Sequence, residues 1–399
     1  MVVRKRNKNA DSTTKEGSGK VSLKSSPEKD KQKKKLDELV KSRKVDNHLV
    51  PMFLLAAVMV CSGVLWTLAF RDVFATGRIV AGKMDEAMLH FTRSTAWFDD
   101  SKGWKSSQGG FSAVKGKTTD ENNMGGLFIR KLGGAAALAF HSQKLIPLIF
   151  QPATAHFGLG HYNMLLFTSV VGNLAIIVFH LSYMDELKAG GADLLPLFTI
   201  IALIVESIIM VCYALTNILD RSSPFLPRKL PPNKTASSIV SKIVLRTVVI
   251  VSGPITIICG RDLFFPGQEF GFPPRDDIYL EWTGAFIHSP PSGTEEAETY
   301  GLEAALQIGD KFAHQLMALY MLILCFQKFA CNFLIRVGID CSGESKCKIF
   351  WRSQIITDAL IMFVIRIFTE SALSASLDLR WHLMSFGYQT FILGLFAFS

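Results

Sequence analysis

Long apolar runs with few charges constrain the fold of this chain more than any other feature of its sequence. Hydrophobic residues make up 49% of its 399 residues, whereas charged residues make up only 19%. A helix needs roughly 20 apolar residues to cross a bilayer, so we expect an all-α fold, a polytopic membrane helix bundle. Hydropathy predicts eight spans, at residues 49–70, 128–150, 164–183, 195–216, 243–265, 311–334, 352–373 and 381–399.

The N-terminal segment differs in composition from the rest of the chain. Residues 1–46 hold 15 of the 43 Lys and Arg residues and no Phe, Tyr or Trp. Such a segment cannot bury enough apolar surface to fold alone, so residues 1–48 are predicted to form a disordered tail. A basic segment beside a first membrane helix is typical of an orientation signal or a contact for anionic lipid. The net charge of +9 therefore does not indicate a nucleic-acid partner.

The distribution of Lys and Arg among the loops predicts how the chain is oriented in the membrane. The tail is basic, and the loop at 217–242 has five basic residues against one acidic residue. The loop at 266–310 instead has nine acidic residues and one Arg. We therefore expect both termini in the cytoplasm, and the loops at 78–127 and 266–310 on the outer or lumenal side. The membrane is an endomembrane or the plasma membrane.

One short passage occurs twice in the chain, as "SGVLWTLAFRDVFATG" at residues 62–77 and as "SGPITIICGRDLFFPG" at residues 252–267. The two copies share six of 16 positions, and in both copies an apolar run ends at an Arg-Asp pair. The similarity continues into the next span at a constant offset, where Phe128, Leu132, Gln143 and Lys144 match Phe312, Leu316, Gln327 and Lys328.

These matches predict an internal repeat with a period near 190 residues. Each half has four predicted spans, an even number, so both halves enter the membrane with the same orientation. The expected relation is a parallel repeat about an axis along the membrane normal. The predicted domains are a tail at 1–48, a four-helix membrane unit at 49–216, a cytoplasmic linker at 217–242 and a second four-helix membrane unit at 243–399.

An adjacent Arg-Asp pair, Arg71-Asp72 or Arg261-Asp262, ends each copy of the duplicated passage. Neighbouring side chains on a helix point about 100° apart, so we expect no pairing within either dipeptide. The Arg side chain would reach the outer headgroups, and the Asp side chain would bind backbone donors at the helix end. The alternative is a charged gate at the outer mouth of a pathway.

Charged residues inside the predicted spans are candidates for function, because an intramembrane charge is costly and usually has a partner or a pathway. Two Lys residues deep in their spans either reach the cytoplasmic surface or pair across the bundle with the acidic residues. The charges are either structural pairs or parts of a transport or proton-relay path. The candidate intramembrane polar site consists of Glu206, Asp358, Arg366, Lys144 and Lys328.

The sequence gives little support to enzymatic activity. It contains no HExxH, GxSxG, P-loop or GxGxxG motif, and its seven Cys residues show neither zinc spacing nor a disulfide framework. We therefore expect no cofactor, no metal and no catalytic residue. The lipid bilayer is the one partner that the sequence identifies. The first hypothesis is a membrane scaffold or regulatory protein, the second a transporter or channel for a small solute or ion with its path between the two repeats, and the third a membrane enzyme.

The first half resembles the family of tumour protein p53-inducible protein 11, which are small four-helix membrane proteins. The resemblance is carried by "SGVLWTLAF" with the following Asp72, by "IRKLGGA" at residues 129–135 and by the four-span layout. The second half lacks the Gly-Gly-Ala, and the duplication and the basic tail also depart from that family. The resemblance implies a membrane helix bundle without a catalytic residue.

Overall fold

The computed structural model describes residues 56–92, 121–150, 159–219, 237–266, 276–283, 308–337 and 344–398. Every regular element within these ranges is an α-helix, which confirms the all-α part of the prediction. All described residues belong to one unit of the chain, Val50–Ser399. The predicted tail at 1–48 lies outside the described residues, as do most of the two long outer loops and the centre of the linker.

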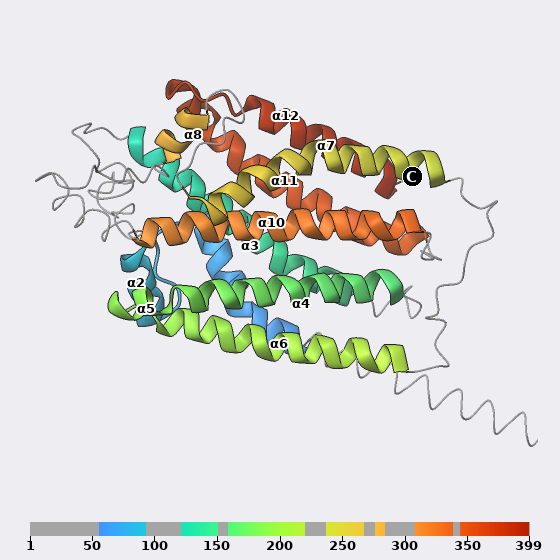
Figure 1. The fold of residues 1–399 in the computed structure, drawn as a ribbon, viewed down its shortest axis with the longest axis horizontal. Coiled ribbons are helices and arrows are strands. Elements are labelled where there is room, and N and C mark those ends of the chain that lie inside the picture. The colour runs from blue at the N-terminus through green and yellow to red at the C-terminus, as the bar shows by residue number, and fades with distance from the viewer. Residues whose placement is uncertain are drawn as a thin grey trace, which may run out of the picture. The chain divides into compact units, whose positions relative to one another are not determined.

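Eight of the described helices have 19 or more residues, and each overlaps one predicted span (Figure 1). They are Ala56–Phe74, α3 (Glu121–Phe150), α4 (Leu159–Ser182), α6 (Leu194–Leu219), α7 (Ser237–Phe264), α10 (Ile308–Val337), α11 (Glu344–Ser374) and α12 (Arg380–Phe398). Three short helices connect them, namely α2 (Gly82–Phe91), α5 (Met184–Ala189) and α8 (Asp276–Thr283).

Five of the described helices are long and apolar enough to cross a membrane, so the chain is an integral membrane protein. Their apolar segments are Ala56–Phe74, Leu165–Ser182 in α4, Leu194–Cys212 in α6, Arg246–Phe264 in α7 and Lys311–Ala330 in α10. The total of eight spans stays a prediction.

Helix α12 does not meet this criterion, yet it carries an apolar surface stripe. The exposed large side chains are spaced three or four residues apart and so lie on one helix face. An exposed apolar stripe of this length is unfavourable in water but suits a helix that faces lipid. Its members are Trp381, Met384, Tyr388, Phe391 and Leu395.

Helix α3 also does not meet this criterion. It differs from α12 because neighbouring helices surround it. No α3 residue from Gly125 to Lys144 is exposed. Helix α3 packs against α10 and α11, while α10 packs against α7, α3 and α4. In Figure 1, α10 runs between α4 and α7. A helix shielded from lipid needs small residues for close packing rather than long apolar ones, which explains the Gly-Gly-Ala of α3.

The helices of the two halves of the chain contact each other in a regular pattern. The N-terminal half (residues 56–219) and the C-terminal half (residues 237–398) exchange contacts: α3 packs against α11, and α10 packs against α4. If α10 corresponds to α3 and α11 corresponds to α4, each of the two contacts joins the second long helix of one half to the third long helix of the other half. The tandem repeat stays a prediction, and these paired contacts are the ones it predicts.

Two glycines make the same close approach in the two halves. A Cβ atom on Gly125 of α3 would lie 1.8 Å from the carbonyl oxygen of Trp282 in α8. A Cβ atom on Gly309 of α10 would lie 1.9 Å from the carbonyl oxygen of Phe91 in α2. Only glycine fits at these positions, because the neighbouring atoms belong to backbone. The short helices α8 and α2 are thereby held against α3 and α10, the central helices of the other half.

Candidate functional site

A buried charge cluster joins four helices of the N-terminal half, and its centre is Glu206 on α6. The Lys144 Nζ atom on α3 lies 2.7 Å from Glu206 Oε2, and both side chains are fully buried. Asn173 Nδ2 on α4 donates to Glu206 Oε2 at 2.8 Å, while its Oδ1 accepts from Lys144 Nζ at 2.8 Å. Ser62 Oγ donates to Glu206 Oε1 at 2.5 Å. We call these four residues the N-terminal cluster.

A second buried charge cluster lies in the C-terminal half, with Asp358 of α11 at its centre. Lys328 Nζ on α10 donates to Asp358 Oδ1 at 2.5 Å, and Gln389 Nε2 on α12 donates to Asp358 Oδ2 at 2.7 Å. Ser252 Oγ on α7 donates to Gln389 Oε1 at 3.5 Å. We call these residues the C-terminal cluster.

The two clusters take one residue from each of the four long helices of their halves, in the same order along the chain, with sequence offsets of 183 to 190 residues. The Ser and the Lys are the same in both clusters. The acid and the amide are exchanged: the N-terminal cluster has its amide on the third long helix and its acid on the fourth, and the C-terminal cluster has the reverse. The matched pairs are Ser62 and Ser252, Lys144 and Lys328, Asn173 and Asp358, and Glu206 and Gln389.

Each cluster therefore contains one ammonium and one carboxylate, and the pair is closed by neutral hydrogen-bonding groups. A buried ion pair compensates its desolvation only when the remaining lone pairs and protons are also satisfied. In the N-terminal cluster, Asn173 donates to Glu206 and accepts from Lys144, so it binds both members of the pair. In the C-terminal cluster, Gln389 binds the carboxylate of Asp358. Lys144 and Lys328 thus pair across the bundle, which is one of the two alternatives left open by the sequence.

The structure does not bring Arg366 to either cluster. Its side chain is 62% exposed on α11, and its Nη1 atom lies 3.7 Å from Oε1 of Glu370, one turn further along the helix. An exposed pair of this kind contributes little to stability. Four of the five candidate intramembrane residues therefore form two ion pairs, and the fifth lies apart from them.

The expectation for the first Arg-Asp pair is wrong. Arg71 Nε lies 2.6 Å from Asp72 Oδ1, and Arg71 Nη1 lies 2.6 Å from Asp85 Oδ1. Asp85 also accepts backbone N–H groups from Val80 and Ala81. The Arg71 side chain is buried and does not reach the headgroups, because Asp85 from the segment after the helix folds back over it.

The second Arg-Asp pair contradicts the expectation in the same way. Arg261 Nη2 lies 2.6 Å from Asp262 Oδ1, and both side chains are almost fully buried. His314 Nε2 of α10 lies 3.2 Å from Asp262 Oδ2. The guanidinium also lies 5.7 Å from the ring centre of Tyr279 in α8. A long guanidinium side chain can fold back onto its neighbour, which the helical angle between adjacent Cβ atoms does not exclude.

Sequence reasoning missed several residues of these assemblies. Lys131 Nζ donates to the carbonyl oxygen of Val73 at 2.6 Å, and Gln315 Nε2 donates to that of Leu263 at 2.6 Å. These two contacts again join matching positions and bind carbonyl groups left free at a helix end. Aligning the third and fourth long helices of the two halves at a similar offset would have indicated Asn173 and Gln389, because each aligns with an acidic residue. The residues missed include Ser62, Asn173, Ser252, Gln389, Asp85, Lys131 and Gln315.

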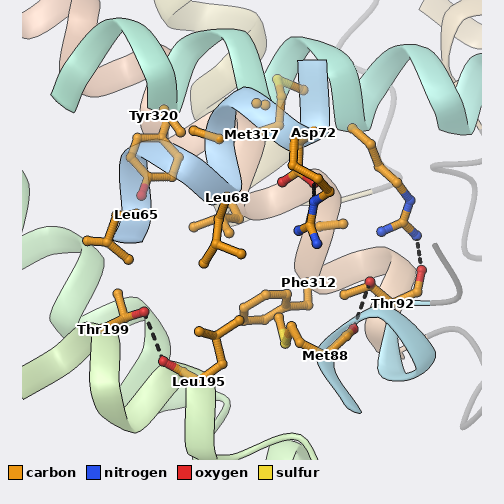
Figure 2. A pocket seen from close by; sticks show the side chains of 18 of the residues that line it. Leu65, Leu68, Asp72, Met88, Thr92, Leu195, Thr199, Phe312, Met317 and Tyr320 are labelled. Atoms are coloured by element: carbon orange, nitrogen blue, oxygen red, sulfur yellow. Dashed lines mark hydrogen bonds and ion pairs between the residues drawn. The ribbon is translucent and has the colours of Figure 1, made fainter. Parts of the chain in front are cut away.

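Two cavities adjoin the central helices. The polar cavity, of about 150 Å³, is lined by charged residues such as Arg71, Asp72 and Arg130 together with apolar side chains. Figure 2 shows Asp72, Met317 and Phe312 around this space, with Tyr320 at its edge. The apolar cavity, of about 510 Å³, is lined mainly by residues of the C-terminal half, together with Phe128 and Leu132 of α3. Neither of these two cavities is lined by the Lys or the acid of a buried cluster.

Within the described ranges, no group of three or more His, Cys, Asp and Glu side chains could hold a metal ion. Comparison of the chain with models of known protein families, with curated proteins and with solved structures found no match.

Proposed function

We propose that this chain is a membrane scaffold or regulatory protein without catalytic activity, built as eight spans in two tandem parallel four-helix units. One observation carries the functional proposal: the buried charged side chains inside the helix bundle form ion pairs with one another. Both oxygens of Glu206 accept hydrogen bonds from side chains, and so do both oxygens of Asp358. A carboxylate whose two oxygens both accept hydrogen bonds from protein side chains holds helices together and is poorly placed to bind a solute.

The paired contacts support the tandem units. The Ser and Lys positions, the glycines and the helix-end contacts fall at corresponding places in both halves, whereas the acid and the amide are exchanged. The proposed orientation places both termini and the linker in the cytoplasm, where the basic tail meets anionic lipid. An experimental structure should relate residues 56–212 to 243–398 by an axis near the membrane normal, and an axis in the membrane plane would contradict the proposal.

The functional proposal is tested by replacing the Lys144–Glu206 pair with apolar residues of similar volume. The double variant Lys144→Met, Glu206→Leu removes both charges together, so no buried charge is left unpaired. We expect this variant to fold and to reach its membrane at wild-type levels. Proteoliposomes with the wild-type chain should show no protein-dependent flux of protons, alkali cations or chloride. Flux that disappears in Glu206→Gln while the fold persists would refute the scaffold proposal.

A transporter or proton relay is the second candidate, and a specific contact favours it. Tyr320, which lines the polar cavity, places its hydroxyl 3.5 Å from His141 Nε2. His141 Nδ1 in turn lies 3.4 Å from Lys144 Nζ. These side chains connect the polar cavity to the N-terminal cluster and cross from one half to the other. In this candidate, Tyr320→Phe should abolish proton flux in proteoliposomes without changing the unfolding temperature.

A further inference from the structure

We propose that the apolar cavity binds a neutral membrane amphiphile, with a compact apolar body and a single hydroxyl-type polar end. The cavity volume of about 510 Å³ lies within the roughly 300–1,000 Å³ usual for small-molecule sites. Side chains from α3, α7, α8, α10, α11 and α12 line it. Those that carry the argument are Phe128, Ile258, Met321, Ile361, Phe386 and His382.

Three polar residues of the apolar cavity, Asp378, Trp381 and His382, lie close together in the chain, in the turn between α11 and α12 and at the start of α12. Tyr279 of α8 and Cys259 of α7 also line the cavity. The Nδ1 atom of His382 is buried and has no hydrogen-bond partner among the described residues. A buried polar atom without a partner is costly, so this atom is suited to a hydrogen bond with a ligand.

The charge at this end of the cavity is already balanced. Arg380 binds both carboxylate oxygens of Asp378, with Nε and Nη2 each at 2.8 Å. A ligand therefore needs neither a positive nor a negative charge at this end of the cavity. An uncharged polar group such as a hydroxyl meets this condition.

The counterpart in the N-terminal half explains why only one of the two cavities suits such a ligand. The polar cavity uses corresponding positions, for example Leu68 and Phe312 in place of Ile258 and Phe128. It is smaller, at about 150 Å³, and its lining includes the Arg71-Asp72 pair, whereas Arg261 and Asp262 do not line the apolar cavity.

A pair of small residues accompanies this difference in size. Gly134 of α3 allows close contact with the Ala56–Phe74 helix, because a Cβ atom there would lie 2.7 Å from Asp72 Cβ. The corresponding positions on α10 hold Met317 and Ala318 in place of Gly133 and Gly134. The close glycine contact that Gly134 makes therefore has no counterpart at these positions of α10.

Entry of the ligand from the bilayer is consistent with the rim of the apolar cavity. Trp381 lines the cavity and is 69% exposed at the start of the lipid-facing stripe of α12. Tryptophan is enriched at the membrane interface, where a polar end of an amphiphile also lies. If the polar end of a lipid alcohol lies at the depth of Trp381, its hydroxyl group lies at the same depth as His382.

The test uses the full chain in nanodiscs and three photoreactive, alkyne-bearing probes: a sterol, a monoacylglycerol and a fatty acid. Mass spectrometry maps the labelled peptides. We expect labelling of α11 and α12 by the sterol, the monoacylglycerol or both, which distinguishes the two sources of a lipid alcohol. Labelling by the fatty acid alone would overturn the assignment of a neutral ligand.

Matched variants separate cavity binding from contact with annular lipid. Ile361→Phe fills the cavity, and Ile367→Phe makes the same change on the exposed face of α11, where Ile367 is 48% exposed. We expect Ile361→Phe to lower labelling about tenfold while Ile367→Phe leaves it unchanged. Equal labelling of both variants would overturn the proposal.

The polar end is tested by His382→Phe, which keeps a ring in place and removes the hydrogen-bonding atom. The loss of one hydrogen bond to the ligand should lower labelling by the neutral probes about fivefold. If Ile361→Phe fails to fold, competition on the wild-type chain decides: an excess of untagged lipid alcohol should remove the labelling. Labelling that neither competition nor His382→Phe reduces would refute the site.

Discussion

Asn173 on α4 and Asp358 on α11 each lie on the third long helix of their half, and each accepts a hydrogen bond from a buried Lys, at 2.8 Å and 2.5 Å respectively. One is an amide and the other is a carboxylate, and the residue on the following long helix carries the complementary group. Charge balance is thus conserved within each cluster although the position of the acid is not. This exchange allows a direct test of whether the clusters are equivalent.

The first prediction relocates the carboxylate of the N-terminal cluster. Glu206→Gln alone leaves Lys144 buried without a counter-ion, which should cost about 3–5 kcal/mol. Adding Asn173→Asp restores an acid at the position that Asp358 occupies in the other half, so the double variant should recover most of that loss. Asn173→Asp alone, with two acids and one Lys, should also be destabilised. Thermal unfolding in detergent measures all three, and a double variant no more stable than Glu206→Gln would contradict the equivalence.

The second prediction concerns Gly125 and Gly309. Alanine at either position would place a Cβ atom against a backbone carbonyl oxygen, which cannot move without shifting a short outer helix. We expect each substitution to lower the free energy of unfolding by about 1–3 kcal/mol. Gly253→Ala in α7 is the control, since nothing lies within 4 Å of a Cβ atom there. Unfolding temperatures that fall equally in all three variants would show that packing against the outer helices is not the cause.

The third prediction concerns the outer ion pair of Arg71 and Asp85. Asp85→Ala removes the acceptor for Arg71 and for two backbone N–H groups, so the segment from Arg78 to Phe91 should detach from the bundle. Limited proteolysis from the outer side should then cleave this segment faster than in the wild type. Glu86→Ala is the matched control, because the Glu86 side chain is 47% exposed. Equal cleavage of the two variants would show that the ion pair does not hold the segment.

The fourth prediction tests the orientation in the membrane. Asn233 lies in an Asn-Lys-Thr sequon within the proposed cytoplasmic linker, outside the described residues. It should carry no glycan in eukaryotic cells, because glycosylation takes place on the lumenal side. A sequon introduced into the 284–307 segment should be glycosylated, which controls for access to the machinery. If endoglycosidase treatment changes the gel mobility of the wild-type chain, Asn233 carries a glycan, and this result would contradict the proposed topology.

Properties that depend on local pattern could be predicted from the sequence. The long helices follow from runs of apolar residues, and the Arg366–Glu370 contact follows from i,i+4 spacing on one helix. The duplicated passage indicated that Lys144 and Lys328 correspond. Hydropathy also predicted the membrane, because five of these helices contain long apolar segments with few charged residues.

The partners of the buried charges were decided only by the tertiary structure. Glu206 meets residues 33, 62 and 144 positions away, on three other helices, and the rotation of each helix about its axis depends on packing with all its neighbours. The burial of Arg71 likewise depends on Asp85, which reaches it only after the chain turns back. Hydropathy measures how readily a segment enters lipid, but it does not determine which of its faces meets lipid. Helix α3 is buried and α12 exposes an apolar stripe because of the helices that surround them.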